Sequence, residues 1–179
     1  MTGTNEFTTE RLVMRRYHMD DSLILYEKFG RDPQMYKYSG WNPYASYDMA
    51  CSTVQKFIES YKRPDFYGWA IEHEGQLIGT IGAYEYDPKR NCIETGVSIE
   101  RDFWGKGYAT EALKCAIGEL FRMGCTCVRA GYFSENPARG RVMEKSGMHR
   151  TGKTEEITYR EKVHVCILCE IHKDACFCS

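Results

Sequence analysis

The segment ETGVSIERDFWGKGYATEAL, residues Glu94–Leu113, carries most of what the sequence predicts about the fold. It begins as a strand, passes through two closely spaced glycines, Gly105 and Gly107, and continues into a run of good helix formers. Glycines are useful where the backbone turns tightly or approaches a ligand. A helix N-terminus carries unpaired N–H groups and a partial positive charge. With the charge of Lys106 beside it, this turn is predicted to hold an anion, a phosphate or a diphosphate.

The spacing of the glycines argues against two other phosphate-binding motifs. The nucleotide-binding pattern G-x-x-x-x-G-K-[ST] is absent from the chain. The dinucleotide pattern G-x-G-x-x-G fails because Thr110 occupies the place of its third glycine. A G-x-G pair is also compatible with a tight turn that binds nothing. The motif alone does not decide between this turn and an anion site.

Length and composition indicate one domain without a membrane or nucleic-acid partner. A chain of 179 residues is long enough to bury a full core. Its formal net charge of -1 gives no overall field that would attract nucleic acid or an acidic membrane. No stretch approaches the roughly 20 apolar residues of a membrane span, and the N-terminus lacks the apolar core of a signal peptide. We therefore expect a cytoplasmic protein.

The chain has nine cysteines, which are expected to be free thiols in a reducing compartment. Cys166 and Cys169 form a C-x-x-C pair in a predicted strand, where their odd separation points the two thiols to opposite faces. The C-x-C pairs fit no ordinary two-pair zinc pattern; they are Cys125/Cys127 and Cys176/Cys178. No metal site is expected, although the pair in the C-terminal tail could bind metal adventitiously or oxidise.

The order of predicted elements is typical of a mixed α/β domain built on one twisted sheet. About seven strands are expected, over residues 11–17, within a hairpin at 68–87, and at 91–100, 125–133, 149–158 and 161–171. About four helices are expected, over residues 21–30, 47–62, 108–123 and 136–147. The strand–helix–strand unit in the middle of the chain implies that the two strands flanking it are parallel neighbours.

Two stretches together resemble the central motifs of the GNAT superfamily, the N-acetyltransferases that use acetyl-coenzyme A. They are the segment quoted above and ENPARGRVMEKSGM, residues Glu135–Met148. The N-terminal stretch TTERLVMRRYHMDDSLILYEKFGRDPQMYKYSGWNP looks like the opening of the branch that contains the ribosomal-protein N-terminal (Rim-type) acetyltransferases. The resemblance runs from about Thr8 to about Ile171, so residues 1–179 are expected to form one acyltransferase domain with a core of 8–171 and a short tail of 172–179.

The resemblance implies acetyl-coenzyme A as co-substrate, no metal, and a set of cofactor contacts. The family's loop pattern [QR]-x-x-G-x-[GA] falls on Trp104–Ala109, with Trp104 in place of the usual Gln or Arg. The strand that carries Val97 is expected to splay from a parallel neighbour at 127–132, to take the pantetheine arm in the gap, and to open at a bulge marked by Gly96. The expected cofactor contacts are Val97, Ser98, Ile99, Trp104, Gly105, Lys106, Gly107, Tyr108, Ala109, Thr110, Asn136 and Arg139.

Direct attack of an amine on the acetyl thioester is the expected chemistry, and it needs a base because an ammonium group has no lone pair. Strand alternation places Glu94 on one face with Gly96 and Ser98, leading towards the splay, so Glu94 is the first candidate. Glu85, on the preceding strand, is the second candidate. Both residues are also compatible with solvated strand carboxylates, Glu85 more so than Glu94.

The proton donor for the leaving thiolate is less clearly indicated. The family often has a Tyr or Ser in its second motif, and the corresponding positions here hold Met143 and Arg139. Arg139 is expected to bind a coenzyme phosphate or to neutralise the thiolate. Three alternatives stay open for the proton itself: solvent, Tyr132 or Tyr108.

The acceptor is expected to bind in the N-terminal half of the chain. The segment MYKYSGWNPYASY, residues Met35–Tyr47, is rich in aromatic side chains, and Trp41, Tyr44 and Trp69 are predicted to contact the substrate. The acceptor class is a protein N-terminal α-amine or a small-molecule amine. Two other functions remain possible from the residues: transfer of a longer acyl group, and a coenzyme A-binding regulatory module without turnover. A monomer and a homodimer are both compatible with the sequence.

Overall fold

A mixed sheet of eight strands runs through the computed structural model, which describes residues 3–38 and 44–174. The strands are β1 (Phe7–Thr8), β2 (Val13–Arg15), β3 (Tyr67–His73), β4 (Gln76–Asp87), β5 (Cys92–Ile99), β6 (Cys127–Phe133), β7 (His149–Tyr159) and β8 (Lys162–His172). Their order across the sheet is β1-β2-β3-β4-β5-β6-β8-β7, and β5–β6 is a parallel pair between antiparallel neighbours. The predicted α/β class is confirmed, and the strand beyond the expected seven is β1.

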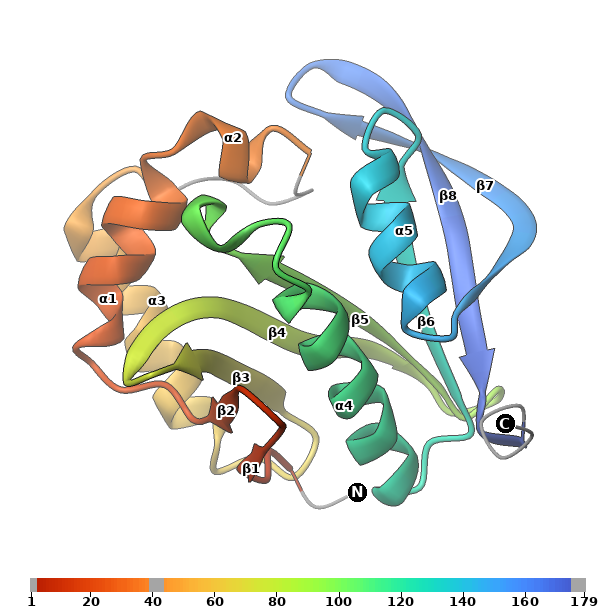
Figure 1. The fold of residues 1–179 in the computed structure, drawn as a ribbon, viewed down its shortest axis with the longest axis horizontal. Coiled ribbons are helices and arrows are strands. Elements are labelled where there is room, and N and C mark those ends of the chain that lie inside the picture. Colours follow the sequence, from red (N-terminus) through yellow and green to blue (C-terminus); the bar gives the residue numbers. More distant parts are fainter. Residues whose placement is uncertain (1–2, 39–43, 175–179) are drawn as a thin grey trace.

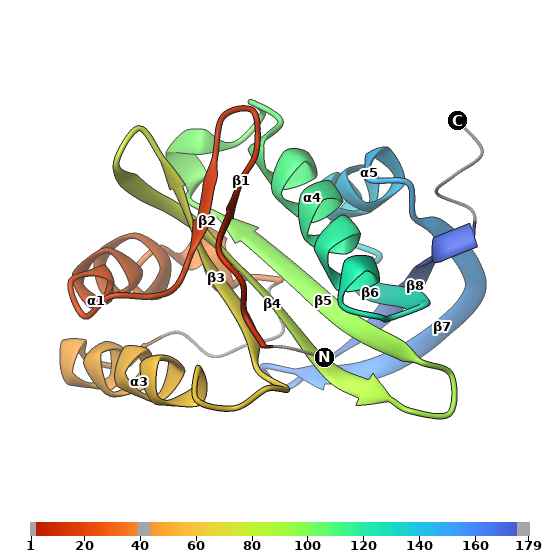
Figure 2. The ribbon, with the colours of Figure 1, turned by 90° about the horizontal axis from the view of Figure 1, so that it is seen from below.

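Helices cover both faces of this sheet, as Figures 1 and 2 show. They are α1 (Asp21–Ile24) with its π-helical continuation η1 (Leu25–Gly30), α2 (Pro33–Tyr36), α3 (Tyr47–Ser60), the short 3-10 helix η2 (Arg101–Phe103), α4 (Tyr108–Arg122) and α5 (Pro137–Lys145). Helix α2 was not among the expected helices, although Asp32 and Pro33 are a usual N-cap and first helical residue. Among the described residues, no helix is long and apolar enough to cross a membrane.

Two apolar cores follow from this layering. The larger core lies between the sheet and α4, and includes Ile93, Leu113 and Val128. The smaller core lies under α1, η1 and α3. Trp69 belongs to the larger core, with 0% of its surface exposed, and its Nε1 donates a hydrogen bond to the Asn5 carbonyl oxygen over 2.6 Å. The predicted substrate contact at Trp69 is therefore wrong, because no solvent-facing ligand reaches this side chain.

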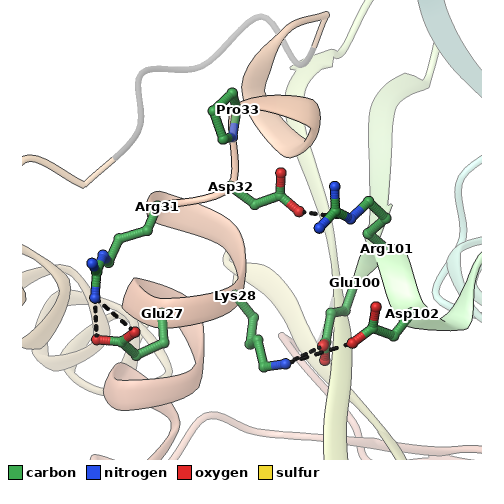
Figure 3. A pocket seen from close by; sticks show the side chains of 8 residues that line it. All are labelled: Glu27, Lys28, Arg31, Asp32, Pro33, Glu100, Arg101 and Asp102. Atoms are coloured by element: carbon green, nitrogen blue, oxygen red, sulfur yellow. Dashed lines mark hydrogen bonds and ion pairs between the residues drawn. The ribbon is translucent and has the colours of Figure 1, made fainter.

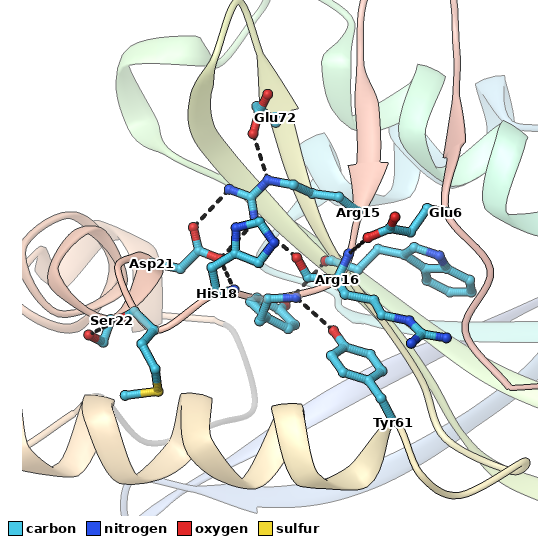
Figure 4. Close-up of polar contacts among 11 residues, drawn as sticks. Glu6, Arg15, Arg16, His18, Asp21, Ser22, Tyr61 and Glu72 are labelled. Carbon is cyan, nitrogen blue, oxygen red and sulfur yellow. Dashed lines mark hydrogen bonds and ion pairs between the residues drawn. The ribbon is translucent and has the colours of Figure 1, made fainter.

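A bidentate ion pair attaches α1 to the sheet (Figure 4). Arg15 in β2 donates to both carboxylate oxygens of Asp21, at 2.8 Å each, and to Glu72 over 2.6 Å. These two carboxylates raise the pKa of Arg15 above its ordinary value. Asp21 is 4% exposed and also accepts from the backbone N–H of His18. Paired hydrogen bonds of this kind fix orientation as well as distance, so Arg15 orients the helical layer that lies over this face of the sheet.

Two cysteines depart from the expectation of free thiols. Cys92 and Cys127 face each other across the parallel β5–β6 pair and form a disulfide. The free cysteines of the described chain are Cys51, Cys115, Cys125, Cys166 and Cys169. Cys176 and Cys178, whose behaviour was part of the expectation about metals, lie outside the described residues.

Candidate active site

The parallel strands β5 and β6 are joined only at one end. Their pairing runs over three positions, from Cys92 opposite Cys127 to Glu94 opposite Arg129, and then stops. Beyond this point β5 continues to pair with β4 as far as Ile99, while β6 continues to pair with β8. The two halves of the sheet diverge from their common end in Figure 1. The expected splay is present, and the edges of β5 and β6 that face it have no neighbouring strand.

The bulge beside the splay lies in β4 and not at Gly96. The β4–β5 register is regular where Gly96 faces Gly82, and it shifts between Tyr84 and Asp87, where Glu85 has a φ of 51°. Gly96 instead provides space. A Cβ at this position would lie 3.0 Å from Tyr84 Oη and 3.4 Å from Arg139 Nη2, so the missing side chain lets these two groups lie over the strand.

The glycine turn after β5 is exposed, and its backbone requires glycine. Gly105 has a φ of 76° and Gly107 a φ of 84°, both in the left-handed region that disfavours other residues. Gly107 is the N-cap of the 15-residue helix α4 and has no side chain with which to cap it. The first N–H groups of α4 therefore face outward without a capping acceptor, which is the arrangement that binds anions at helix N-termini.

Trp104 fastens this turn to the end of β5. Its Nε1 donates to the carbonyl oxygen of Ile99 over 2.6 Å, while half of the residue's surface stays exposed. The Ile99 carbonyl, one of the predicted backbone contacts for pantetheine, is thus already an acceptor. Val97 and Ser98 are the predicted contacts that lie farther from this anchor, along the open edge of β5.

Glu94 lies at the last paired position before the splay, on the face opposite α4. Its neighbours Ile93 and Thr95 are buried at 1% and 2% exposure, which confirms the alternation predicted for this strand. Glu94 Oε2 lies 3.1 Å from Arg129 Nε, and its side chain is 29% exposed. Burial raises the pKa of Glu94 above its ordinary value, and the charge of Arg129 opposes this shift.

Glu85 shares Arg129 with Glu94 but has a different environment. Its carboxylate lies 3.2 Å from Arg129 Nη2, and its side chain is 68% exposed. The structure therefore brings both candidate bases to one guanidinium at the start of the splay. Burial raises the pKa of Glu94, which favours proton uptake, so Glu94 fits the role of a base better than the exposed Glu85.

Arg139 extends from the first turn of α5 into the splay. Its Nη2 lies near the Cα of Gly96, and its Nε is buried with no hydrogen-bond partner among the described residues. Burial lowers the pKa of Arg139, yet a guanidinium remains a cation under all ordinary conditions. Asn136, the N-cap of the same helix, uses its Oδ1 to accept from the Arg139 backbone N–H. The splay thus contains a positive charge with an unused donor.

The two tyrosines considered as proton donors have different surroundings. Tyr108 Oη lies 2.9 Å from His73 Nε2, a residue at the end of β3. Tyr132 is 4% exposed beneath α5, on the face of β6 opposite Arg129, and burial raises its pKa. Met143 is 2% exposed and apolar. None of these three side chains is therefore a free proton donor beside the splay on the face of the sheet that carries Glu94.

A cavity of about 870 Å³ lies on the same face as Glu85. Aromatic side chains dominate its lining, among them Phe29, Tyr44, Phe57 and Tyr84. Tyr44 lies in this lining, and its predicted contact with the substrate stays a prediction. Trp41 lies outside the described residues. The cavity and the splay therefore meet at the start of the open edge of β5, around Tyr84 and Glu85.

A family model of the acetyltransferase (GNAT) domain matches residues 11–149 of the chain. The chain belongs to the GNAT acetyltransferase family. A curated relative, the uncharacterized N-acetyltransferase YoaA of Bacillus subtilis, is 28% identical over 155 residues, which cover 85% of this chain and 87% of YoaA.

Solved structures of other GNAT proteins share the whole fold. RimL, a ribosomal-protein α-N-acetyltransferase in complex with coenzyme A, superposes with a TM-score of 0.84 at 16% identity, covering 96% of this chain and 99% of RimL. A chimera of the spermidine N-acetyltransferase SpeG from Vibrio cholerae superposes with a TM-score of 0.77 at 18% identity, covering 92% and 97% of the two chains. At these identities the likeness establishes the GNAT fold and leaves the acceptor open.

Arg11, which lies between β1 and β2, supports the glycine turn of this GNAT domain. Its Nη1 donates to the Lys106 carbonyl oxygen over 3.0 Å, and its guanidinium lies 4.5 Å from the centre of the Tyr108 ring. Its Nε donates to Glu111 over 2.7 Å, and Glu111 also accepts from Thr9. The sequence analysis missed this contact, because 95 residues separate Arg11 from Lys106. The network holds the turn in one backbone conformation.

We expect Arg11→Ala to weaken binding of coenzyme A about fivefold. This change removes the solvent-screened hydrogen bond to the Lys106 carbonyl oxygen and lets the turn relax from the conformation that presents its N–H groups. Isothermal titration calorimetry on Arg11→Ala measures this change. Arg63→Ala is the matched control, because the exposed Arg63 pairs with the exposed Asp65 and not with the glycine turn. Unchanged affinity in Arg11→Ala would contradict the supporting role.

A second cavity, of about 470 Å³, lies between η1, the start of α2 and the residues that follow β5 (Figure 3). Its charges are paired within it: Lys28 Nζ lies 3.1 Å from Glu100 Oε1, and Arg101 Nε lies 3.1 Å from Asp32. Glu100 is 2% exposed. These pairs attach η1 and α2 to the residues that lead into the glycine turn, so that these helices and the turn share one support.

Proposed function

We propose that the chain transfers the acetyl group of acetyl-coenzyme A to a primary amine. The observation that carries this proposal is the end of β5–β6 pairing at Glu94 and Arg129, with an uncapped glycine turn at the far end of β5. An extended pantetheine arm can add to an open strand edge as a further strand would. The diphosphate would then meet the N-terminus of α4. When bound, the coenzyme supplies an activated acetyl thioester.

The residues around the splay fit this cofactor. A Cβ at Gly105 would meet nothing within 4 Å, so the space above the turn is open to a ligand. The backbone from Gly105 to Thr110 offers N–H groups to a diphosphate, and Lys106 adds a charge. The Nε of Arg139 is buried, has no hydrogen-bond partner among the described residues, and offers a donor inside the splay. Asn136 stays a predicted contact through its amide, beside its capping role.

The proposed reaction uses three groups of this chain. Glu94 takes a proton from the acceptor ammonium, directly or through one water, while Arg129 holds its carboxylate in place. Backbone N–H groups of β5 near Val97 and Ser98 stabilise the negative charge that develops on the carbonyl oxygen. The guanidinium of Arg139 compensates the charge of the departing thiolate, which then takes its proton from solvent. Glu85 remains the second candidate for the base.

The aromatic cavity is the proposed acceptor site. It opens beside Glu85 and lies on the face of the sheet that carries Glu94. RimL is described as acting on a ribosomal protein and SpeG on spermidine, and both acceptors present a primary amine. The lining of this cavity is largely apolar and aromatic, which favours an amine attached to an apolar or peptide body over a linear polycation.

A panel of amines tests the proposal. The purified protein is incubated with acetyl-coenzyme A and, separately, an N-terminal peptide, an aromatic amine, spermidine and free amino acids, and products are identified by mass spectrometry. We expect one acetyl group on an acceptor with an apolar body. Product formed only with longer acyl-coenzyme A would favour the alternative donor. Tight coenzyme binding without product on any amine would favour a regulatory module and overturn the transferase.

A further inference from the structure

Side chains of three neighbouring strands gather at the closed end of the splay. Cys92 in β5 is the register partner of Cys127 in β6, and Cys127 is the register partner of His172 in β8. Register partners project from the same face of a sheet. Glu170 precedes His172 by two residues on β8 and projects from that face as well. The four side chains therefore lie on one patch of the sheet, opposite α4.

The donor atoms of this patch are close enough to share one ion. The Sγ atom of Cys127, a carboxylate oxygen of Glu170 and a ring nitrogen of His172 lie within 4.8 Å of one another. Cys92 Sγ is bonded to Cys127 Sγ, so reduction of the disulfide leaves a second thiolate beside this group. The cysteines are buried, while the His172 side chain is 47% exposed, so that the patch is reached from solvent on the β8 side.

The two oxygens of Glu170 have separate partners. Oε2 pairs with Arg90 Nη2 over 3.0 Å, and Oε1 lies 3.2 Å from His172 Nε2. The contact with Arg90 therefore leaves Oε1 directed at the patch. Together the four residues offer two sulfur donors, one nitrogen and one oxygen.

We propose that Cys92 and Cys127, when reduced, bind a zinc ion together with His172 and Glu170. Zinc prefers four tetrahedral ligands of this kind, and structural zinc sites are built from thiolates and imidazoles supplied by neighbouring elements. Thiolate donors select against magnesium and calcium, which prefer oxygen ligands. The disulfide and the zinc ion are mutually exclusive states of one site, because each uses the same two sulfur atoms.

Conversion between the two states requires an external oxidant, for which a peroxide is sufficient. Two thiolates give up two electrons and form the S–S bond, and the zinc ion leaves. Hydrogen peroxide accepts the two electrons with two protons, its O–O bond breaks, and two waters form. Either state ties β5 to β6 two residues before the splay begins at Glu94. The site is independent of the acetyl-transfer proposal, because none of its residues is assigned a role there.

Zinc binding by the reduced full-length protein tests the inference. The protein is purified with a non-thiol reductant, and zinc is titrated against a chromogenic chelator before and after treatment with hydrogen peroxide. We expect one zinc ion per reduced chain and none per oxidised chain. His172→Ala, an exposed change, and Cys127→Ser are each expected to lower the affinity at least about tenfold. Cobalt substitution should give thiolate-to-metal absorption in the wild type and not in Cys127→Ser.

Two controls separate this site from other thiols. Cys115→Ser removes a free, half-buried cysteine of α4 and is expected to leave zinc binding unchanged. A Cys176→Ser, Cys178→Ser double variant removes the tail cysteines and is also expected to retain the ion. The inference is overturned if the reduced protein binds no zinc, if His172→Ala and Cys127→Ser bind as the wild type does, or if only the tail variant loses the ion.

Discussion

Acetyl-coenzyme A is expected to raise the melting temperature of the wild-type protein and to leave that of Gly107→Glu unchanged. The residue before α4 faces the N–H groups proposed to hold the diphosphate, and a carboxylate there would occupy and repel that site. At a ligand concentration about 100-fold above Kd, binding stabilises the fold by about 2.7 kcal/mol. For a domain of this size this corresponds to a shift of roughly 5–10 °C by differential scanning fluorimetry.

The control for this experiment is Gly107→Ala. Gly107 has a φ of 84°, so any side chain strains the backbone by about 1–2 kcal/mol and lowers the starting melting temperature in both variants. Only the glutamate adds negative charge. We therefore expect Gly107→Ala to keep most of the ligand-induced shift. Equal ligand-induced shifts of the melting temperature in the wild type and in Gly107→Glu would show that the diphosphate does not bind at this turn.

Glu94→Gln is expected to lower kcat at least about 100-fold with the preferred amine, because the amide cannot accept the proton of the ammonium group. The base works only when ionised, and burial raises the pKa of Glu94. Wild-type activity should therefore decline as pH falls through a value above the usual range of a glutamate, and this limb of the pH profile should be absent in Glu94→Gln. Steady-state kinetics across pH measure both effects.

The melting temperature of Glu94→Gln shows whether its loss of kcat comes from the lost base or from a destabilised fold. A carboxyl group whose pKa is higher in the folded state favours folding when protonated, and this contribution is lost as pH rises through the folded-state pKa. Ionised Glu94 therefore costs free energy of folding at neutral pH, and Glu94→Gln should melt no lower than the wild type. Glu85→Gln, at the more exposed partner of the same Arg129, should change kcat little. If Glu85→Gln lowered kcat more than Glu94→Gln did, Glu85 would be the base and Glu94 would not.

Much of the fold and of the candidate site was predictable because it depends on local patterns. The alternation of Glu94, Gly96 and Ser98 against Ile93 and Thr95 follows from the period of a strand, and the structure has it. The left-handed glycines before α4 follow from the residue type itself. The splay between β5 and β6 was expected from a family resemblance, and the register confirms it.

Other features depend on contacts between distant segments. Strand alternation predicts which face of the sheet a side chain lies on, but not whether other elements cover that face. Trp69 was therefore predicted to contact the substrate, although it lies in the core. The bulge was expected at Gly96 and occurs in β4, because the register between two strands is set by their packing and not by one glycine. Arg11 reaches Lys106 only because the turn between β1 and β2 meets the glycine turn before α4 in space.

The sequence by itself determined the order of the longer helices and strands and the turn that begins α4, since short-range geometry decides both. Only the tertiary structure decided which charges and sulfurs come together. The strand β6, which carries Cys127, lies between β5 with Cys92 and β8 with His172. The spacing of these residues along the chain does not show that their strands are neighbours. The physical reason is that long-range pairing is chosen by burial and register over the whole sheet, while residue patterns report only on the nearest few residues.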